Sequence, residues 1–453
     1  MQGTPVTDTI ETTTSGDIIT ELRDWLSDNW DPELTVGQWW ERLGNDGWAA
    51  PTLPAGRYGR GVERAVAVQI SKEVAAFGAL GAPGGLGLLL AAPTISDCGT
   101  PEQVDEYVGD IVTGRKAWCQ LFSEPGAGSD LAGLSTRAVR DGDEWIINGQ
   151  KVWTSLGQIA DMAMLLARTD PDQPKHSGIS YFAIDMHQPG IEVRPLREMT
   201  GHAMFNETFL TDARVGNDAI IGDLNKGWTV ANVTLGHERA GLGAGGGDAG
   251  GGLSGARPGT LAGCLDKRVG DFVSAPKART ATTSAETTDK PAKRRGSNAE
   301  MLAGLARGNG KIDDPVIRQR LAQLHTLGEI GRYNAERSKA LRAQGKNVPG
   351  IGNIAKLSMS NIVRLQRDLG LEIVGAQGML HAYEPEDQEA INEATGNPFL
   401  AGVTGIALYA QAPPIYGGTD QIQRNIISER VLGLPREQGP AKDTPFSELP
   451  KNG

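Results

Sequence analysis

The stretch that decides the fold reads Phe122-Ser-Glu-Pro-Gly-Ala-Gly-Ser-Asp130, and Asn148-Gly-Gln-Lys-Val-Trp-Thr-Ser155 follows it after a β-rich run. The proline and glycines of the first segment predict an irregular loop whose backbone N–H groups can face a ligand. From residue types alone, a plain connector between helices and a sheet explains this loop equally well. Asp141-Gly142 and Asn148-Gly149 separate β-rich runs, and such dipeptides are strong hairpin signals. We therefore expect a compact β domain here.

Helical periodicity flanks this β-rich region on both sides, which predicts an α+β protein with three domains. Part of the last domain is rich in Ala, Thr, Ser, Lys and Arg and poor in large apolar residues, so it cannot bury enough surface to order itself. The expected divisions are an N-terminal helical domain at 18–116, a middle antiparallel β domain at 117–226, a C-terminal helical domain at 227–436 with a mobile insertion at about 253–298, and a tail at 437–453.

Composition excludes several classes of function. The 453 residues carry a formal net charge of −11, which argues against general nucleic-acid binding. Cys98, Cys119 and Cys264 form no Cys-x-x-Cys pair, and the six histidines show no metal-ligand spacing. The segment Met1–Asp17 lacks the features of a signal peptide, and a proline and glycines interrupt the apolar run Ala76–Ala92. We expect a cytoplasmic protein with no metal, no disulfide framework and no membrane insertion.

A third segment, Ile415-Tyr-Gly-Gly-Thr-Asp-Gln-Ile-Gln-Arg424, predicts a glycine turn that opens a helix. Thr419 is suited to the N-cap position, and the glycines allow a ligand to approach the backbone. A helix N-terminus favours a phosphate group. An ordinary capped helix without a ligand is the alternative interpretation.

Taken together, these three segments resemble the acyl-CoA dehydrogenase family, flavoproteins that desaturate acyl thioesters. The resemblance covers about Asp24 to Glu437. It implies the fold of that family, in which the C-terminal domain is a four-helix bundle. It also implies FAD as the cofactor, an acyl-CoA substrate, an electron-transfer flavoprotein or similar acceptor, and a homotetramer or heterotetramer.

The resemblance also assigns roles to individual positions. The positions expected at FAD are Phe122, Ser123, Trp153, Thr154, Ser155, Glu372, Gly375, Thr419 and Gln421, and those expected at acyl-CoA are Ser129, Arg239 and Gly417. In relatives the Trp153 position stacks near the flavin and a hydroxyl bonds its N5 region. That hydroxyl is Ser155 in a gapless alignment, with Thr154 as the alternative.

The segment from Glu372 to Met379 resembles the one by which a neighbouring subunit reaches the same FAD. Relatives often have Gln at the Glu372 position, and a carboxylate beside a pyrophosphate is unfavourable. The family's Arg-x-x-Phe-Gly element, which binds that pyrophosphate, is absent as such. Arg307-Gly-Asn-Gly310 is its nearest counterpart.

The position of Gly417 raises the question of the catalytic base, because many relatives carry their catalytic glutamate there. A minority, including isovaleryl- and long-chain enzymes, place it early in the C-terminal domain, just before an arginine. Leu235-Gly-His-Glu-Arg239 matches that arrangement, so we hypothesise that Glu238 is the base. A surface Glu–Arg pair on a helix is the structural alternative. The missing side chain at Gly417 also favours branched or bulky acyl groups.

Two other functions remain open at this point. The chain could be a non-catalytic or FAD-sharing subunit of a heteromeric acyl-CoA dehydrogenase. It could also be a flavin oxidase or monooxygenase on the same fold.

Overall fold

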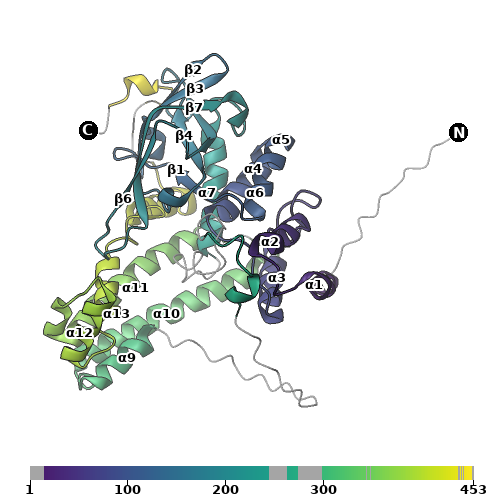
Figure 1. Ribbon diagram of the computed structural model, residues 1–453. Coiled ribbons are helices and arrows are strands. Elements are labelled where there is room, and N and C mark those ends of the chain that lie inside the picture. Colours follow the sequence, from purple (N-terminus) through teal and green to yellow (C-terminus); the bar gives the residue numbers. More distant parts are fainter. Residues whose placement is uncertain are drawn as a thin grey trace.

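The computed structural model describes residues 15–243, 263–273, 298–342, 344–346, 348–436, 439, 441 and 443–450. Helices come first along the chain, then a β sheet, then helices again. In Figure 1 the sheet lies above the C-terminal helices, and the N-terminal helices flank both on the right. This order confirms the predicted α+β layout.

The N-terminal domain is built around tryptophans. Its elements are α1 (Ser15–Asn29), α2 (Val36–Asn45), α3 (Arg64–Phe77), the π-helical turn η1 (Gly87–Ala91), α4 (Ala92–Cys98), α5 (Pro101–Gln103), η2 (Val104–Val108) and α6 (Gly109–Val112). Thr35 and Gln38 form a reciprocal capping box that begins α2. Trp39 of this helix is fully buried, and its ring lies 4.8 Å from that of Trp30 and 5.5 Å from that of Trp25. Aromatic packing of this kind holds α1 against α2.

Residues 263–273 correct one expectation. They fall inside the insertion expected to be mobile, but they are docked on the N-terminal domain. The N–H of Val36 donates to Lys267 O, and the N–H of Val269 donates to Leu34 O, at 2.9 and 2.8 Å. Val269 is completely buried. A few apolar residues and backbone pairing with the start of α2 suffice to order this short piece. The rest of the insertion lies outside the described residues.

The middle domain is a seven-stranded sheet. Its strands are β1 (Trp118–Leu121), β2 (Arg137–Asp141), β3 (Glu144–Lys151), β4 (Met162–Arg168), β5 (Ile179–Asp185), β6 (Ile191–Leu196) and β7 (Phe205–Gly216), and the short 3-10 turns η3 (Leu131–Gly133), η4 (Gly157–Ile159) and η5 (Asn217–Ala219) connect them. The sheet is mixed rather than purely antiparallel, because β4 pairs in parallel with β1 and β2. The long connection at 122–136 carries the chain across the sheet and permits this parallel pairing.

The Asn148-Gly149 dipeptide is not a hairpin turn, contrary to the prediction, because β3 runs straight through it. The ladder with β7 shifts register at this point. The extra residue lies on β7, where Asp212 has φ 52°. Asn148 Nδ2 donates to Asp212 Oδ1, and the N–H of Asp212 donates to Asn148 Oδ1, at 2.9 and 3.1 Å. Asn148 therefore stabilises a β-bulge of its neighbour.

Strands β4 and β5 are buried on both faces and join two cores. Met164 and Tyr181 pack with the N-terminal helices and α7 (Gly227–Gly243). Leu165 and Phe182 pack inside the β domain. This double burial explains why both strands read as nearly continuous apolar runs.

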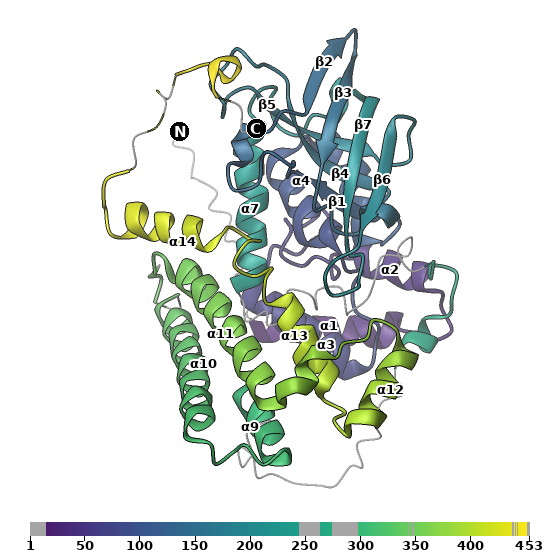
Figure 2. The same ribbon diagram turned by 90° about the vertical axis from the view of Figure 1, so that its left-hand side faces the viewer.

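The C-terminal helices pack around one long central helix. They are α9 (Asn298–Gly308), α10 (Pro315–Arg342), α11 (Ile351–Val374), α12 (Pro385–Thr395), α13 (Leu400–Tyr409) and α14 (Asp420–Ile426), with the short turns η8 (Gly375–Met379) and η9 (Ile427–Val431). Two other short turns dock elsewhere: η7 (Val269–Phe272) on the N-terminal domain and η10 (Phe446–Glu448) on the connection between β4 and β5. Helix α11 contacts α7, α9, α10, α13 and α14, and Figure 2 shows it between α10 and α13. No helix in the described ranges is both long and apolar enough to cross a bilayer.

Candidate functional site

A buried ion pair fixes the loop that follows β1. Lys151 Nζ lies 2.9 Å from Glu124 Oε1 and donates to Phe122 O at 3.0 Å, and the Lys151 side chain is completely buried. Glu124 also accepts hydrogen bonds from the backbone N–H groups of Ser135 and Thr136, at 2.7 and 2.9 Å. Burial alone would raise the pKa of Glu124, but Lys151 and these hydrogen bonds outweigh it and hold the pKa at about 2. The pair locks the Phe122–Asp130 loop onto the end of β3.

Trp153, two residues after Lys151, is held in an uncommon backbone conformation. Its φ is 62°, which is unusual for a bulky residue. The residues on either side are both bonded: the N–H of Val152 donates to Ser123 O at 2.9 Å, and the N–H of Thr154 donates to Asn206 O at 3.0 Å. The Trp153 side chain is 60% exposed and contacts Phe205 edge-on, with 6.0 Å between ring centroids. The strained backbone at Trp153 thus leaves one face of its ring exposed.

The two hydroxyls after Trp153 have different surroundings. Thr154 is completely buried, and its Oγ1 accepts a hydrogen bond from Thr208 Oγ1 at 3.4 Å. Ser155 is only half-buried. Of the two candidates for the flavin N5 region, Ser155 is the residue that is not completely buried. Ser123, on the facing loop, is also half-buried.

The glycine turn before α14 has the backbone that its sequence predicts. Gly417 and Gly418 have φ 61° and 81°, values that glycine adopts without steric cost. Gln423 Nε2 donates to the carbonyls of both, at 3.1 and 3.2 Å. Thr419 caps α14, and its Oγ1 accepts from the N–H of Ile422 at 3.1 Å.

Gln421, the other α14 position expected at FAD, is exposed. The residue before it, Asp420, is buried and lies 2.7 Å from the Arg364 guanidinium of α11. This ion pair ties the start of α14 to α11.

Glu238 lies on a face of α7 that is buried in its earlier turns. Ala231 and Thr234 are completely buried, and helical spacing places Glu238 on the same side. The Thr234 hydroxyl donates to Tyr181 Oη of β5 at 3.3 Å. Glu238 is half-buried. Burial raises its pKa, and the adjacent Arg239, whose side chain is exposed, partly opposes this.

Glu372 and Gly375 lie apart from the α14 candidates, at the other end of α11. Nineteen residues of helix separate Glu372 from Asn353, which bonds Gln423 of α14 at 2.7 Å. At 1.5 Å per residue this is about 28 Å. The length of α11 therefore separates Glu372 and Gly375 from the candidate residues of α14.

The negative charge of Glu372 is compensated. Arg320 Nη1 lies 2.8 Å from Glu372 Oε2, and Lys311 Nζ donates to Glu372 O at 2.7 Å. Asn309, within the Arg307–Gly310 candidate segment, donates to Ile373 O at 2.7 Å. The structure thus brings this segment beside Glu372 and adds two cations that the sequence patterns did not single out.

Ser129 is exposed and lies at the outer end of the first loop. The next residue, Asp130, pairs with Lys175 at 2.7 Å. This bridge ties the loop to the connection between β4 and β5.

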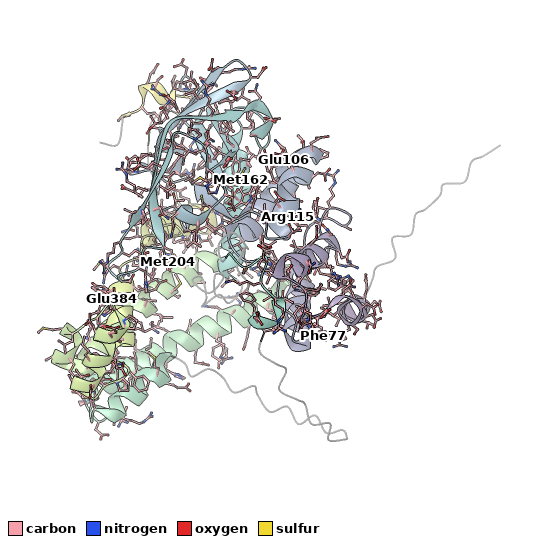
Figure 3. The ribbon with its side chains drawn as sticks, in the orientation of Figure 1. Phe77, Glu106, Arg115, Met162, Met204 and Glu384 are labelled. Atoms are coloured by element: carbon pink, nitrogen blue, oxygen red, sulfur yellow. The ribbon has the colours of Figure 1, made fainter. Side chains whose placement is uncertain are left out.

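Two cavities are lined by other residues. One of about 450 Å³ is lined by Arg197, His381 and Glu384 among others, and one of about 280 Å³ is lined by Glu106, Met162 and neighbours. Figure 3 labels Glu384 beside the C-terminal helices and Glu106 and Met162 between the sheet and the N-terminal helices. Neither cavity includes a candidate catalytic or cofactor residue, so cavity size is no guide to this site.

Taken one by one, the candidate residues suit a flavin. The exposed Trp153 face, the half-buried hydroxyls of Ser123 and Ser155 and the capped turn at Thr419 offer a stacking surface, polar contacts and a phosphate-compatible helix start. Helix α11 contacts both α7 and α14, so the helices that carry Glu238 and Thr419 share a neighbour. Fold and site together define a flavin-dependent oxidoreductase.

Comparison with known proteins identifies the family. Three family models match: the acyl-CoA dehydrogenase N-terminal domain at residues 6–115, the middle domain at 119–213 and the C-terminal domain at 302–432. The acyl-CoA dehydrogenase IpdE1 of Mycobacterium tuberculosis (strain ATCC 25618 / H37Rv) is 34% identical over 437 residues, which cover 92% of this chain and 97% of the relative. The chain belongs to the acyl-CoA dehydrogenase family.

Solved structures of acyl-CoA dehydrogenases have a similar fold. A structure titled Tcur3481-Tcur3483 steroid ACAD has a TM-score of 0.63 at 25% identity, covering 95% of this chain and all of its counterpart. The ChsE4-ChsE5 complex from Mycobacterium tuberculosis has a TM-score of 0.60 at 26% identity, covering 96% and 100%. The chain is therefore an oxidoreductase that acts on acyl-CoA, and its cofactor is FAD.

Proposed function

We propose that this chain removes hydrogen from the α and β carbons of an acyl-CoA thioester, giving the trans-2-enoyl-CoA, with Glu238 as the base. The observation that carries the proposal is the half-buried carboxylate of Glu238 on the same face of α7 as Thr234. Gly417, where many relatives have their glutamate, offers no side chain.

A partly desolvated carboxylate suits the chemistry. The α proton of a thioester is weakly acidic, so the base must have a pKa above that of an exposed carboxylate. Burial raises the pKa of Glu238 in that direction. In this proposal Glu238 takes the proton from the α carbon, while the backbone N–H of Gly417 donates to the thioester oxygen and stabilises the developing charge. FAD, when bound, accepts the hydride from the β carbon, and the C=C bond forms between the two carbons.

Proton removal can be tested separately from hydride transfer. A 3-thiaacyl-CoA has sulfur at the β position and cannot give up a hydride, but its α protons can still exchange with D2O. We expect the wild-type holoenzyme to catalyse this exchange, measured by mass spectrometry, and Glu238→Gln to slow it at least about 100-fold. His237→Gln is the matched control, because His237 pairs with Asp97 at 2.9 Å on another side of the helix. Equal exchange by wild type and Glu238→Gln would refute the assignment.

We further propose a bulky acyl group as the substrate class. A relative at 25% identity is titled a steroid ACAD, and Gly417 leaves one wall of the expected pocket without a side chain. Anaerobic titration with straight-chain, branched and ring-bearing acyl-CoAs, followed by flavin absorbance, tests this. Fastest bleaching by a straight-chain substrate would contradict it.

A second function is favoured by a specific observation. The Glu372 group lies about 28 Å along α11 from the α14 group, and the Glu372–Met379 segment resembles the one by which a neighbouring subunit reaches FAD. Both observations support a proposal that the two groups serve different flavins. Ile330, Tyr333 and Ile354 are large apolar side chains left exposed on α10 and α11. The similar ChsE4-ChsE5 structure is a complex of two named components. The chain could therefore share its FAD with an unlike subunit in a heterotetramer rather than form a homotetramer.

Purification distinguishes these possibilities. If the chain alone is yellow and an acyl-CoA bleaches it anaerobically, the dehydrogenase proposal stands. If it is colourless until a related subunit is added, it is an FAD-sharing subunit. If turnover consumes oxygen without an electron-transfer flavoprotein or similar acceptor, it is an oxidase or monooxygenase.

A further inference from the structure

The C-terminal segment 443–450 does not behave as a free tail. It lies against the connection between β4 and β5, where the N–H of Phe446 donates to Gln173 O and the N–H of Ser447 donates to Pro171 O, both at 2.9 Å. Figures 1 and 2 show the short yellow turn of this segment against the sheet, far along the chain from the strands it touches.

Phe446 covers a buried arginine. The Arg168 guanidinium carbon lies 3.8 Å from the centroid of the Phe446 ring, and Arg168 is only 3% exposed. Burial lowers the pKa of Arg168 to about 10, although Glu124 and Asp170 oppose the shift. A cation–π contact to a desolvated guanidinium is among the stronger contacts of its kind.

Arg168 in turn holds two loops. Its Nη2 donates to Ala132 O at 2.7 Å, and its Nη1 donates to Lys175 O at 2.8 Å. Lys175 Nζ then bridges to Asp130 at 2.7 Å. The residue before Asp130 is Ser129, the expected acyl-CoA contact. Arg168 therefore connects the C-terminal segment to the substrate loop.

The same connection also touches α7. The His176 ring lies 5.1 Å from the Trp228 ring, in the first turn of that helix. Ten residues separate Trp228 from Glu238, which is about 15 Å of helix. The pantetheine arm of CoA separates the thioester from the nucleotide by a comparable stretch. The loops that Arg168 holds are thus placed for the CoA end of the substrate rather than its reacting carbons.

We propose that Phe446 and Arg168 are positioning residues: the C-terminal segment 443–450 straps the loop that carries Ser129 and so sets affinity for the CoA portion of the substrate. The proposal rests on the proposed function, because it takes Ser129 as an acyl-CoA contact. It requires no contact between Phe446 and the substrate.

The test compares Phe446→Ala, Phe446→Tyr and the wild-type holoenzyme. Loss of the ring removes the contact that covers the Arg168 guanidinium, so Phe446→Ala should raise the Kd of free CoA by about 3- to 10-fold, measured by calorimetry. It should raise KM for acyl-CoA similarly and leave kcat within about twofold. Phe446→Tyr keeps the ring and should restore the wild-type Kd. Phe77→Ala removes an exposed aromatic ring from α3 and should change none of these values.

An unchanged CoA Kd in Phe446→Ala would overturn the proposal. Equal losses of FAD affinity, kcat and CoA affinity would also overturn it, because they indicate a merely structural role. The CoA measurement needs no turnover. If no acyl-CoA reduces the flavin, the proposed function fails. The role of Phe446 and Arg168 is still tested by the Kd of CoA.

Discussion

Replacing Lys151 with Met should produce a large and pH-dependent loss of stability. The substitution keeps most of the side-chain volume but removes the ammonium group that lies 2.9 Å from Glu124. A buried carboxylate left without its cation costs about 3–5 kcal/mol. Protonation of Glu124 limits this cost at pH 7 to about 3 kcal/mol, because protonating an ordinary glutamate costs about 1.36 kcal/mol for each pH unit above its pKa of 4.5.

The wild type and the variant should respond oppositely to acid. In the wild type the folded-state pKa of Glu124, about 2, lies below the ordinary value of 4.5. The lowered pKa of Glu124 therefore contributes stability above pH 4.5, about 3 kcal/mol of which is lost as pH falls toward 2. In Lys151→Met the buried carboxylate has a raised pKa, so protonation stabilises the folded state and the deficit shrinks as pH falls from 7 to 5.

Urea unfolding followed by tryptophan fluorescence measures both effects. Arg214→Met is the control, because the Arg214–Glu144 pair is half exposed on both sides and its loss should cost less than about 1 kcal/mol. Lys151→Met should also release FAD more readily, since Lys151 holds Phe122 O. A loss below 1 kcal/mol, or a deficit that does not shrink toward pH 5, would refute this account of the pair.

Three further expectations follow from the geometry. Thr419→Ala removes the cap on the N–H of Ile422 and should lower the free energy of unfolding by about 1 kcal/mol, while Thr419→Ser retains most of it; equal urea midpoints would argue against a working cap. Gly418→Ala should cost about 1–3 kcal/mol and weaken FAD binding, because φ is 81° and the new Cβ would lie 2.6 Å from Gln423 Nε2; FAD fluorescence titration checks this. The proposed mechanism needs Glu238 ionised, and burial raises its pKa, so it predicts that kcat/KM falls tenfold per pH unit below that pKa; a rate flat down to pH 4.5 would contradict the assignment.

The sequence allowed the candidate site to be predicted only in part. Motif positions such as Trp153 and Thr419 could be identified because a short local pattern carries them. The Glu124–Lys151 pair joins residues 27 apart, and no local pattern reports such a contact. The sequence did hold one indication of a buried lysine. Lys151 is an even number of residues from the buried Trp145 and Ile147 along β3, which places its side chain on the same inward face.

The fold differed from expectation where long-range contacts outweigh local signals. Asn148-Gly149 has the composition of a turn, but β7 supplies a bulge that lets β3 continue. Val269 is buried because it pairs with a segment more than 200 residues earlier. The docking of Phe446 depends on Arg168, nearly 280 residues away. Each outcome is set by a partner that single-sequence patterns cannot specify.

The central claim is that Glu238 is the base. Its most direct test is the rate at which a saturating acyl-CoA bleaches the flavin under anaerobic conditions, measured by stopped-flow absorbance in wild type and Glu238→Gln. We expect the variant to retain FAD and to bleach at least about 100-fold more slowly. Bleaching at the wild-type rate would show that the carboxylate at Glu238 is not the base and that the proton is taken by another group.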